Sequence, residues 1–550
     1  MKKIFTIVSL TAAVLGMVSC ASADKMAKMA EQVTVDCNPS PLVVKGGKID
    51  ADLTVNYPAK YFNKKAIMEV TPVIVYGDKE LAGEPIMYQG EKVEDNYTVV
   101  AYDGGTVSKH LTFKYSKGME ICSLELRGRC TTDGKKWVTL PTKKVADGLN
   151  INETLICSKG YYDYKADAYQ AVIVTNPEAQ IMYTINSSEV RSKELRNASV
   201  NALKETLAEA QANERKTIKD IEVIAYASPD GGEKLNAKLS DRRSKTADKA
   251  ATKVMKSGKI QGVSTEVKSV GQDWEGFQEC VAKSDVEDKD LIIRVLSMYN
   301  DPAVREKEIR NMSSVYQELA KDVLPQLRRA RLVANVEYKN YTDEELLELV
   351  KTNVDVLDEE ALLKVASISP SADAKVEIYT IAANKYNSAR AAFNLAVLSL
   401  NDKENDEAKT TLAALDAKDA DVINAKGVIA LRAGDCASAK SLFASANTAD
   451  AKKNLAIVDV KEGNYAAAVA KFGNEKSANA AVAKLLNGDV AGALATVKDV
   501  DTPQANYVKA ICLNRQGKVS EAKAALKKAT DACKKLAERA KVDIEVANLK

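Results

Sequence analysis

Four regularly spaced glycines in the C-terminal part of the chain mark an internal repeat. The anchors are Gly434, Gly463, Gly488 and Gly517, at spacings of 29, 25 and 29 residues. Each has a small residue seven positions before it, an alanine five after it and a large apolar residue nine after it. These are Gly427, Ala456, Ala481 and Ala510; Ala439, Ala468, Ala493 and Ala522; and Phe443, Phe472, Val497 and Leu526. A fifth unit fits with Ala396, Ala408 and Leu412, where Lys403 replaces the glycine.

Glycine at each anchor predicts a tight turn between two antiparallel helices, because glycine adopts the left-handed conformation without strain. The small residues allow close approach of the helices, and the large residue fills the next interface. Residues 371–550 contain 44 alanines and one proline. The pattern resembles a divergent tetratricopeptide array, expected over 341–550 with one or two irregular helix pairs in 342–390. The resemblance implies a concave face that binds a protein or peptide partner; a rigid helical cap is the alternative.

Residues 171–340 are expected to form a separate α/β domain. Strand and helix patterns alternate there, which predicts a mixed sheet. The expected strands are Gln180–Ile185, Ile221–Tyr226, Val263–Val270 and Leu332–Tyr338, and the expected helices are Lys193–Ala212 and Asn236–Met255. A further helical segment is inserted at about 275–325, before the last strand.

The sequence IAYASPDG over 224–231 is followed by Leu235 and Asn236, Leu239 and Ser240, and Arg243 and Ser244. This signature resembles the OmpA-like, peptidoglycan-associating domain. The resemblance implies a site for the diaminopimelate of peptidoglycan. In that family a loop aspartate meets the ligand's ammonium, and a helix arginine meets its carboxylate through paired charge-assisted bonds.

This chain matches one of the two charged positions of that site and departs from the other. Arg243 falls on the arginine, but Ser228 falls on the aspartate, and Asp230, two residues later, is the candidate substitute. Loss of the carboxylate predicts weak peptidoglycan binding. Asn236 is expected to be structural, as a cap of the helix. The alternative for Arg243 is a surface arginine that pairs with Asp241 or Glu233.

The N-terminus has the pattern of an export signal. Two lysines precede a short apolar run, and Met17–Cys20 resembles a bacterial lipobox, in which Cys20 is acylated. We therefore expect a signal peptide over 1–19, a lipid-anchored tether over 20–32, and localisation at the outer membrane. Plain secretion with cleavage after Ala21, Ser22 and Ala23 is the alternative. No other stretch is apolar enough for a transmembrane helix.

Residues 33–170 are expected to form a β-sandwich of immunoglobulin-like type. Ile49, Ala51, Leu53 and Val55 alternate with polar residues, and turn pairs such as Gly46 and Gly47 separate the strand candidates. The four cysteines of this region, Cys37, Cys122, Cys130 and Cys157, allow two disulfides in three connectivities. For Cys280, Cys436, Cys512 and Cys533 we expect free thiols. The fold class is thus multidomain: β-sandwich, α/β domain and all-α array.

Composition narrows the function. Lys+Arg is 79 and Asp+Glu is 76, so no basic surface for nucleic acid is expected. There is one histidine, and no phosphate loop, nucleophile elbow or metal-ligand spacing, so neither an enzyme nor a cofactor is expected. The sequence favours an outer-membrane lipoprotein scaffold that faces the periplasm, with service to a membrane-protein assembly or secretion machine as one form. The alternative is a surface-exposed adhesin-like or glycan-capture protein that binds through its sandwich.

Overall fold

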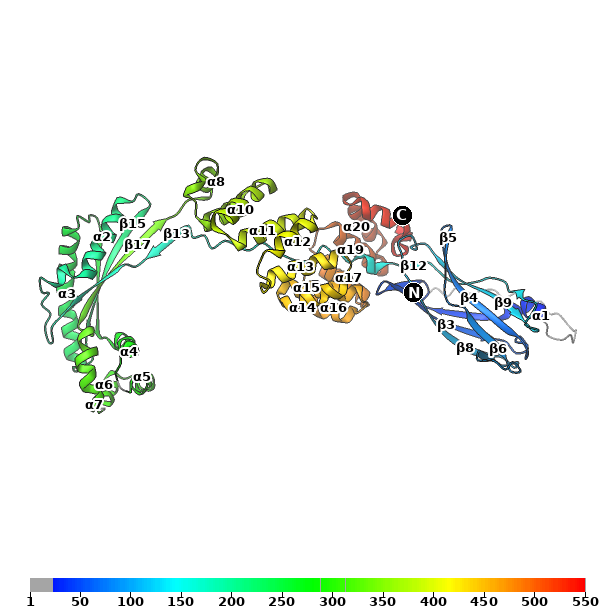
Figure 1. The fold of residues 1–550 in the computed structure, drawn as a ribbon, viewed down its shortest axis with the longest axis horizontal. Helices are drawn as coiled ribbons and strands as arrows, with labels where there is room; N and C mark the ends of the chain where they lie inside the picture. Colours follow the sequence, from blue (N-terminus) through cyan, green and yellow to red (C-terminus); the bar gives the residue numbers. More distant parts are fainter. Residues whose placement is uncertain (1–22, 287, 312, 550) are drawn as a thin grey trace. The chain divides into compact units, whose positions relative to one another are not determined.

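The computed structural model describes residues 23–286, 288–311 and 313–549 (Figure 1). The chain divides into two compact units. The first is discontinuous and combines the chain up to Lys165 with Ala389–Lys550, whereas the second is Ala166–Ser388. The expected signal peptide and Cys20 lie outside the described residues.

The first described element is a helix rather than a tether. Helix α1 (Ala23–Met29) and the short helix η1 (Ala30–Gln32) lead directly into the sandwich. Ala23 and Met26 share one face of α1 because they are three residues apart, and Met26 is fully buried in the sandwich core. The prediction of a tether is therefore wrong for residues 23–32.

Two sheets pack face to face over one apolar core to form the sandwich (Figure 1, blue). One sheet contains β1 (Thr34–Asn38), β2 (Leu42–Lys45), β3 (Lys48–Tyr57), β8 (Gly105–Lys114) and β12 (Leu149–Asn150). The other contains β4 (Ile67–Tyr76), β5 (Lys79–Ala82), β6 (Ile86–Gly90), β7 (Thr98–Val100), β9 (Ser123–Thr131), β10 (Val138–Thr139) and β11 (Lys143–Asp147). Strand β3 buries Ile49, Ala51, Leu53 and Val55, as their alternation predicts.

The sandwich ends earlier than predicted. Its last strand stops at Asn150, so the stretch 151–170 lies outside it, and Cys157 is not a residue of the β-domain. Cys37, Cys122, Cys130 and Cys157 are all free thiols. Burial raises the pKa of Cys122 and of Cys130 to about 11, with neighbouring acids adding to the effect, which keeps both as inert thiols.

The second unit centres on a five-stranded sheet. Its strands are β13 (Val172–Thr175), β14 (Glu178–Met182), β15 (Lys216–Ala227), β16 (Ser264–Gln272) and β17 (Arg329–Lys339). Strand β17 is antiparallel to β13, β14 and β15, whereas β15 and β16 are parallel. Helices α2 (Ala198–Ala212) and α3 (Glu233–Ser257) pack their buried side chains against this sheet, and η3 (Glu194–Arg196) precedes α2.

Helices fill the chain between β16 and β17. They are α4 (Trp274–Lys283), α5 (Lys289–Met298), α6 (Pro302–Asn311), α7 (Ser313–Glu318), η4 (Leu319–Val323) and η5 (Leu324–Leu327). Phe277, Ile292 and Leu319 belong to a small core of their own. The helical segment expected at about 275–325 thus runs from Trp274 to Leu327.

Three helices expected in the repeat array belong instead to the second unit. They are α8 (Asp343–Thr352), α9 (Glu359–Ile368) and α10 (Ala372–Tyr386), with η6 (Val354–Val356) between the first two. Arg215, beside β15, holds α8 through a 2.7 Å bond from Nη2 to Glu345 Oε1. The array of the first unit therefore begins at Ala389 rather than at 341.

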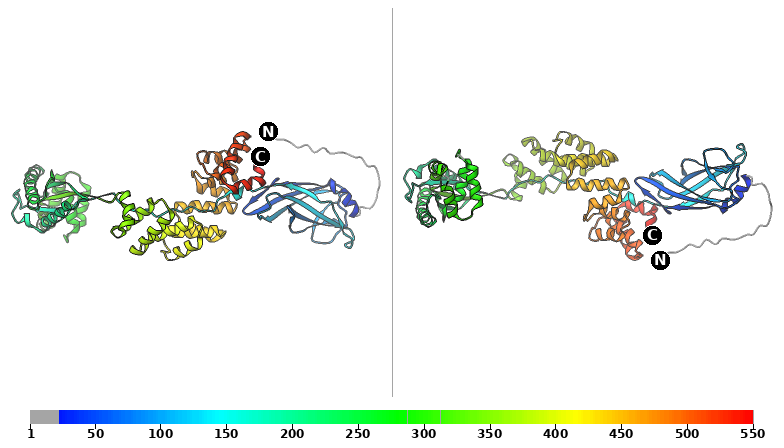
Figure 2. Two further views of the ribbon diagram at one scale, coloured as in Figure 1. Left: turned by 90° about the horizontal axis from the view of Figure 1, so that it is seen from above. Right: turned by 90° about the horizontal axis from the view of Figure 1, so that it is seen from below.

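The array consists of helix pairs that follow one another in chain order (Figures 1 and 2, yellow to red). The pairs are α11 (Ala389–Asn401) with α12 (Asn405–Ala413), α13 (Ala420–Arg432) with α14 (Cys436–Ala446), α15 (Ala449–Lys461) with α16 (Tyr465–Phe472), α17 (Ala478–Leu486) with α18 (Val490–Thr496), and α19 (Pro503–Arg515) with α20 (Val519–Ala532). Helices α21 (Lys534–Val542) and η7 (Ile544–Leu549) end it.

Every predicted turn position has a left-handed backbone. The φ angles are +69° at Lys403, +82° at Gly434, +78° at Gly463, +87° at Gly488 and +78° at Gly517. The helices of a pair also approach as closely as their small residues imply. A Cβ atom on Gly427 would lie 2.5 Å from Cε1 of Phe443, so only glycine fits at that position.

We predict that Gly434→Ala lowers the free energy of unfolding by about 1–2 kcal/mol, because alanine resists the left-handed conformation. Gly463→Ala should lower it further. Its new Cβ would also lie 3.0 Å from Lys45 Cγ and 3.3 Å from Gly46 N, in the β2–β3 turn of the sandwich. Chemical denaturation of the full chain measures both changes. Lys452→Ala, at an exposed position of α15, is the control, and equal effects of all three substitutions would contradict the turn assignment.

Candidate functional site: an asparagine ladder on the repeat array

Four buried asparagines lie on the first helices of successive pairs. Asn394 on α11, Asn424 on α13, Asn454 on α15 and Asn479 on α17 are each at most 7% exposed. A buried amide is costly unless its donors and acceptor find partners. We call this set the asparagine ladder.

The ladder's partner is a segment of the same chain. Residues 156–165, the resident segment, have neither helix nor strand structure (Figure 1, cyan). Cys157 N donates to Asn479 Oδ1 (2.8 Å), and Asn479 Nδ2 donates back to Cys157 O (2.9 Å). Asn454 makes the same two bonds with Tyr161 (2.7 and 2.8 Å). Asn394 makes them with Lys165 (2.7 and 2.9 Å).

Asn424 completes the ladder between these contacts. Its Nδ2 donates to Tyr161 O (2.9 Å), and its Oδ1 accepts from Asn454 Nδ2 (2.9 Å). The ladder thus binds the backbone N–H and C=O groups of every fourth residue of the segment. The segment runs against the order of the array, so its later residues contact earlier helix pairs. Because these bonds go to the backbone, they do not depend on the side chains at Cys157, Tyr161 and Lys165.

Side chains add sequence-dependent contacts. Lys165 Nζ lies 2.9 Å from a carboxylate oxygen of Asp419 and of Asp421. Partial burial opposes the charge of Lys165, but the hydrogen bonds to Asp421 and Asp419 outweigh it and raise its pKa. Burial likewise opposes the charge of Asp419, and the bonds from Lys165 and from the Val422 N–H lower its pKa overall. Both groups are therefore held in their charged forms.

The tyrosines of the resident segment are bound through their hydroxyls. Tyr161 Oη donates to Ser477 Oγ at 3.2 Å. Tyr162 Oη accepts from Arg432 Nη2 at 2.8 Å and donates to Asn401 Oδ1 at 3.1 Å.

The chain just before the resident segment joins the sandwich to the array. The helix η2 (Asn152–Leu155) carries Glu153, which is buried. Its carboxylate accepts from Gly46 N (2.6 Å), Gly47 N (2.9 Å) and Tyr465 Oη (2.6 Å). Because Gly46 and Gly47 form the β2–β3 turn and Tyr465 begins α16, one side chain connects both parts of the first unit.

In the α/β domain, Arg243 is not the surface arginine of the alternative prediction. It is 1% exposed, and its guanidinium donates to the carbonyl oxygens of Ser187 (2.9 Å), Tyr226 (2.9 Å) and Thr184 (3.3 Å). Burial, with a smaller contribution from the neighbouring charge of Arg328, lowers the pKa of Arg243 to about 10. Asp241 pairs with Lys245 instead.

The loop before α3 brings the other predicted residues together. Ser228 Oγ donates to the Asp230 carboxylate, which Arg328 Nη2 neutralises at 2.9 Å. Asn236 Nδ2 donates to Ser228 O (2.9 Å) and Gly231 O (2.7 Å). The prediction that Asn236 caps the helix is wrong, because α3 begins earlier, with Gly232 as its cap residue. Asn236 instead holds the loop through its carbonyls.

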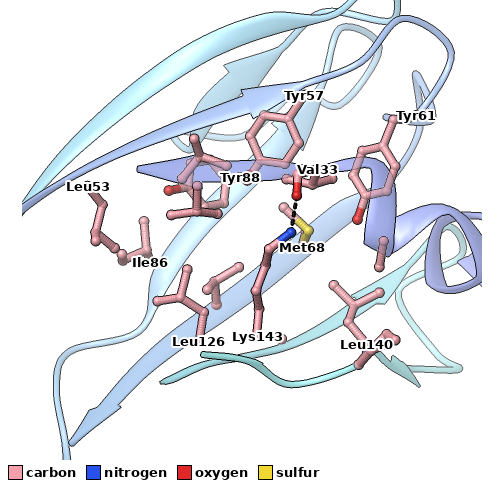
Figure 3. Close-up of a pocket in the computed structure, with 16 residues that line it drawn as sticks. Val33, Leu53, Tyr57, Tyr61, Met68, Ile86, Tyr88, Leu126, Leu140 and Lys143 are labelled. Atoms are coloured by element: carbon pink, nitrogen blue, oxygen red, sulfur yellow. Dashed lines mark hydrogen bonds between the residues drawn. The ribbon is translucent and has the colours of Figure 1, made fainter. Parts of the chain in front are cut away.

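The sandwich contains an apolar cavity between its sheets (Figure 3). Its volume is about 60 Å³, and Tyr57, Tyr61 and Tyr88 are among the residues that line it. The Lys143 ammonium points to Val33 O, to which it donates. The small, apolar lining suits a few carbon atoms rather than a sugar.

In the parts of the chain that the structure describes, no helix is long and apolar enough to cross a bilayer. Within the same residues, histidine, cysteine and acidic side chains form no cluster that could hold a metal ion.

Sequence reasoning missed the ladder, although the repeat contained a signal for it. Asn394, Asn454 and Asn479 each stand two residues before the small residue of their unit, and Asn424 stands three before Gly427. Buried asparagine at a repeated helical position is unusual, because such a residue must have a polar partner.

No protein-family model matches the chain, and no curated protein matches it. A tetratricopeptide repeat protein from Parabacteroides merdae is 16% identical, with a TM-score of 0.30, and the match covers 37% of this chain and 91% of that one. Pseudomonas aeruginosa pilF is 15% identical at a TM-score of 0.20, covering 38% and 88%. Yeast Tom70 is 14% identical at 0.23, covering 65% and 73%. At such scores the description of the array as tetratricopeptide-like rests on its own turns and helix pairs.

We predict that Asn454→Ala loosens the resident segment, because Tyr161 N loses its acceptor and Tyr161 O keeps only the bond from Asn424. The loss is expected to be about 1–3 kcal/mol. Limited trypsin digestion of the full chain, read as the rate of cleavage after Lys159, measures it. Asn506→Ala is the matched control. Asn506 lies on α19 and is 5% exposed, but its amide donates to Asp501. Equal cleavage of wild type and Asn454→Ala would contradict the ladder's role.

Proposed function

We propose that the protein is a non-enzymatic scaffold of the bacterial envelope, anchored to the outer membrane through acylated Cys20, whose repeat array binds protein segments that lack helix and strand structure. The observation that carries the proposal is the asparagine ladder. It bonds both backbone groups of every fourth residue in a chain that has no regular secondary structure. Such a surface is suited to binding peptide backbone.

Helix α1 limits how far the sandwich could lie from a lipid on Cys20. Cys20 is three positions before Ala23, the first described residue, which lies on α1 and is buried in the core of the sandwich. An extended chain of that length spans about 10 Å. An acyl group on Cys20 would therefore hold the sandwich close to the lipid surface, on the periplasmic side in our proposal. The glycan-capture alternative gains nothing from the sandwich, because the cavity there is apolar and small.

We predict that wild-type protein stays with the outer membrane after a salt wash, whereas Cys20→Ala is soluble or unprocessed. Cys37→Ala, which removes a free, half-buried thiol of the sandwich, should behave as wild type. Fractionation with acyl-chain labelling reads both steps. If processed Cys20→Ala still sediments with membranes, the anchor lies elsewhere.

Peptidoglycan binding by the α/β domain is proposed to be weak. Ser228 stands where the OmpA-like family has its aspartate, and Asp230 is already paired with Arg328. A ligand ammonium would have to displace an arginine whose side chain is 14% exposed.

We predict that Arg328→Gln strengthens binding to purified sacculi by about tenfold, because the freed carboxylate can form a charge-assisted bond with the ligand. Arg310→Gln is the matched control, since Arg310 donates to the backbone oxygen of Asp230 (2.7 Å) and not to its carboxylate. Sedimentation with sacculi measures binding, and thermal unfolding checks the fold. Tight binding by wild type that Arg328→Gln abolishes would mean that Arg328 itself contacts the wall.

A further inference from the structure

The array restricts which side chains the resident segment can carry, whereas a site that contacts only the peptide backbone would not. Gly160 has a φ of +84°, and a Cβ there would lie 2.7 Å from Val428 Cγ2 on α13. A side chain at this position is thus excluded twice, by the backbone and by Val428. Glycine is required between the two backbone contacts of the ladder at Cys157 and Tyr161.

Two kinds of side-chain contact favour particular residues after Gly160: cations of the array over aromatic rings, and carboxylates of the array around a lysine. Arg432 lies over the Tyr162 ring (5.5 Å) and donates to its hydroxyl, while Lys453 lies over the Tyr161 ring (5.2 Å). Five residues after the glycine, Lys165 lies between two acids and over the Phe393 ring (5.2 Å). The array therefore provides cations for aromatic rings and carboxylates for a lysine, in a fixed order.

The segment can leave without unfolding a helix or a sheet. Residues 156–165 belong to neither, and the side chains of Tyr161, Tyr162 and Lys165 are only partly buried. Departure would remove the backbone partners of four buried amides and leave only the bond between Asn424 and Asn454. This costs free energy until another backbone replaces the segment. Exchange of one peptide segment for another on the ladder is therefore favoured over an empty ladder.

We propose that the ladder face is a sequence-selective peptide site that residues 156–165 keep occupied. Its external ligand is a protein segment with the same pattern: glycine, two aromatic residues, any residue, an aromatic residue and lysine. The later aromatic position is that of Tyr164, whose hydroxyl accepts from Asn401 Nδ2 (3.1 Å). This ligand enters by displacing the resident segment. The proposal rests on the proposed function and adds to it the chemistry of the partner and the competitor that the partner must overcome.

The test is a binding titration of the full chain with a fluorescent peptide of residues 154–167, under reducing conditions. Suppose that the resident segment is dissociated from the ladder in about 1% of the molecules. Wild type should then bind the peptide about 100-fold more weakly than a variant whose own segment cannot bind the ladder. Gly160→Val is that variant, and Tyr161→Ala with Lys165→Ala is a second in case the first does not fold. Adding Asn454→Ala to either should weaken binding at least about tenfold.

Each outcome separates the two proposals. If wild type and both variants bind the peptide with equal affinity, the claim that the resident segment competes with the peptide is overturned. Equal binding of a scrambled peptide, or of one with Lys165→Glu, would overturn sequence selectivity while leaving a backbone-binding scaffold intact. If neither folded variant binds any peptide, the ladder serves only the chain itself and the proposed peptide-binding function fails as well. Membrane anchoring through Cys20 is independent of all these results.

Discussion

The buried amides of the asparagine ladder connect the parts of the first unit. Asn394, Asn424, Asn454 and Asn479 would each cost about 1–3 kcal/mol if left without partners. The resident segment, for its part, has backbone groups that no helix or strand satisfies. The asparagine amides and the backbone of the segment satisfy each other's hydrogen bonds. These contacts join residues 229 to 322 positions apart in the chain. Helix packing alone would build the array but would not bind this segment to it.

This interaction explains why the first unit is discontinuous. The resident segment follows the sandwich and precedes the α/β domain, whereas its binding surface comes at the C-terminal end of the chain. Glu153 strengthens the same connection, because it bonds the β2–β3 turn and Tyr465 together. Glu545, after α21, adds a bond from Asn150 Nδ2 (2.6 Å). The sandwich and the array thus form one unit into which the α/β domain is inserted.

Local patterns were predictable, and contacts between distant segments were not. The helix pairs follow from glycine turns and small residues within each unit, and the helical array was predicted from them. The resident segment has no periodicity, so nothing in its own sequence indicates what it binds. The same reason explains why the alternative for Arg243, a surface arginine, is wrong. Its carbonyl partners come from β15 and from the loop after β14, and a helix sequence read by itself suggests an exposed basic residue. The position of residues 23–32 just after the lipobox predicts a tether, whereas the spacing of Ala23 and Met26 gives α1 an apolar face that packs on the sandwich.

The central claim is that the chain's own residues occupy the ladder, and hydrogen exchange at single amides tests it most directly. The amides of Cys157, Tyr161 and Lys165 each donate to an asparagine oxygen. They should exchange slowly in the wild-type full chain, and the Tyr161 amide should exchange at least about tenfold faster in Asn454→Ala. Exchange of all three amides at the rate of an unstructured peptide would show that the segment is not bound, and would contradict the account.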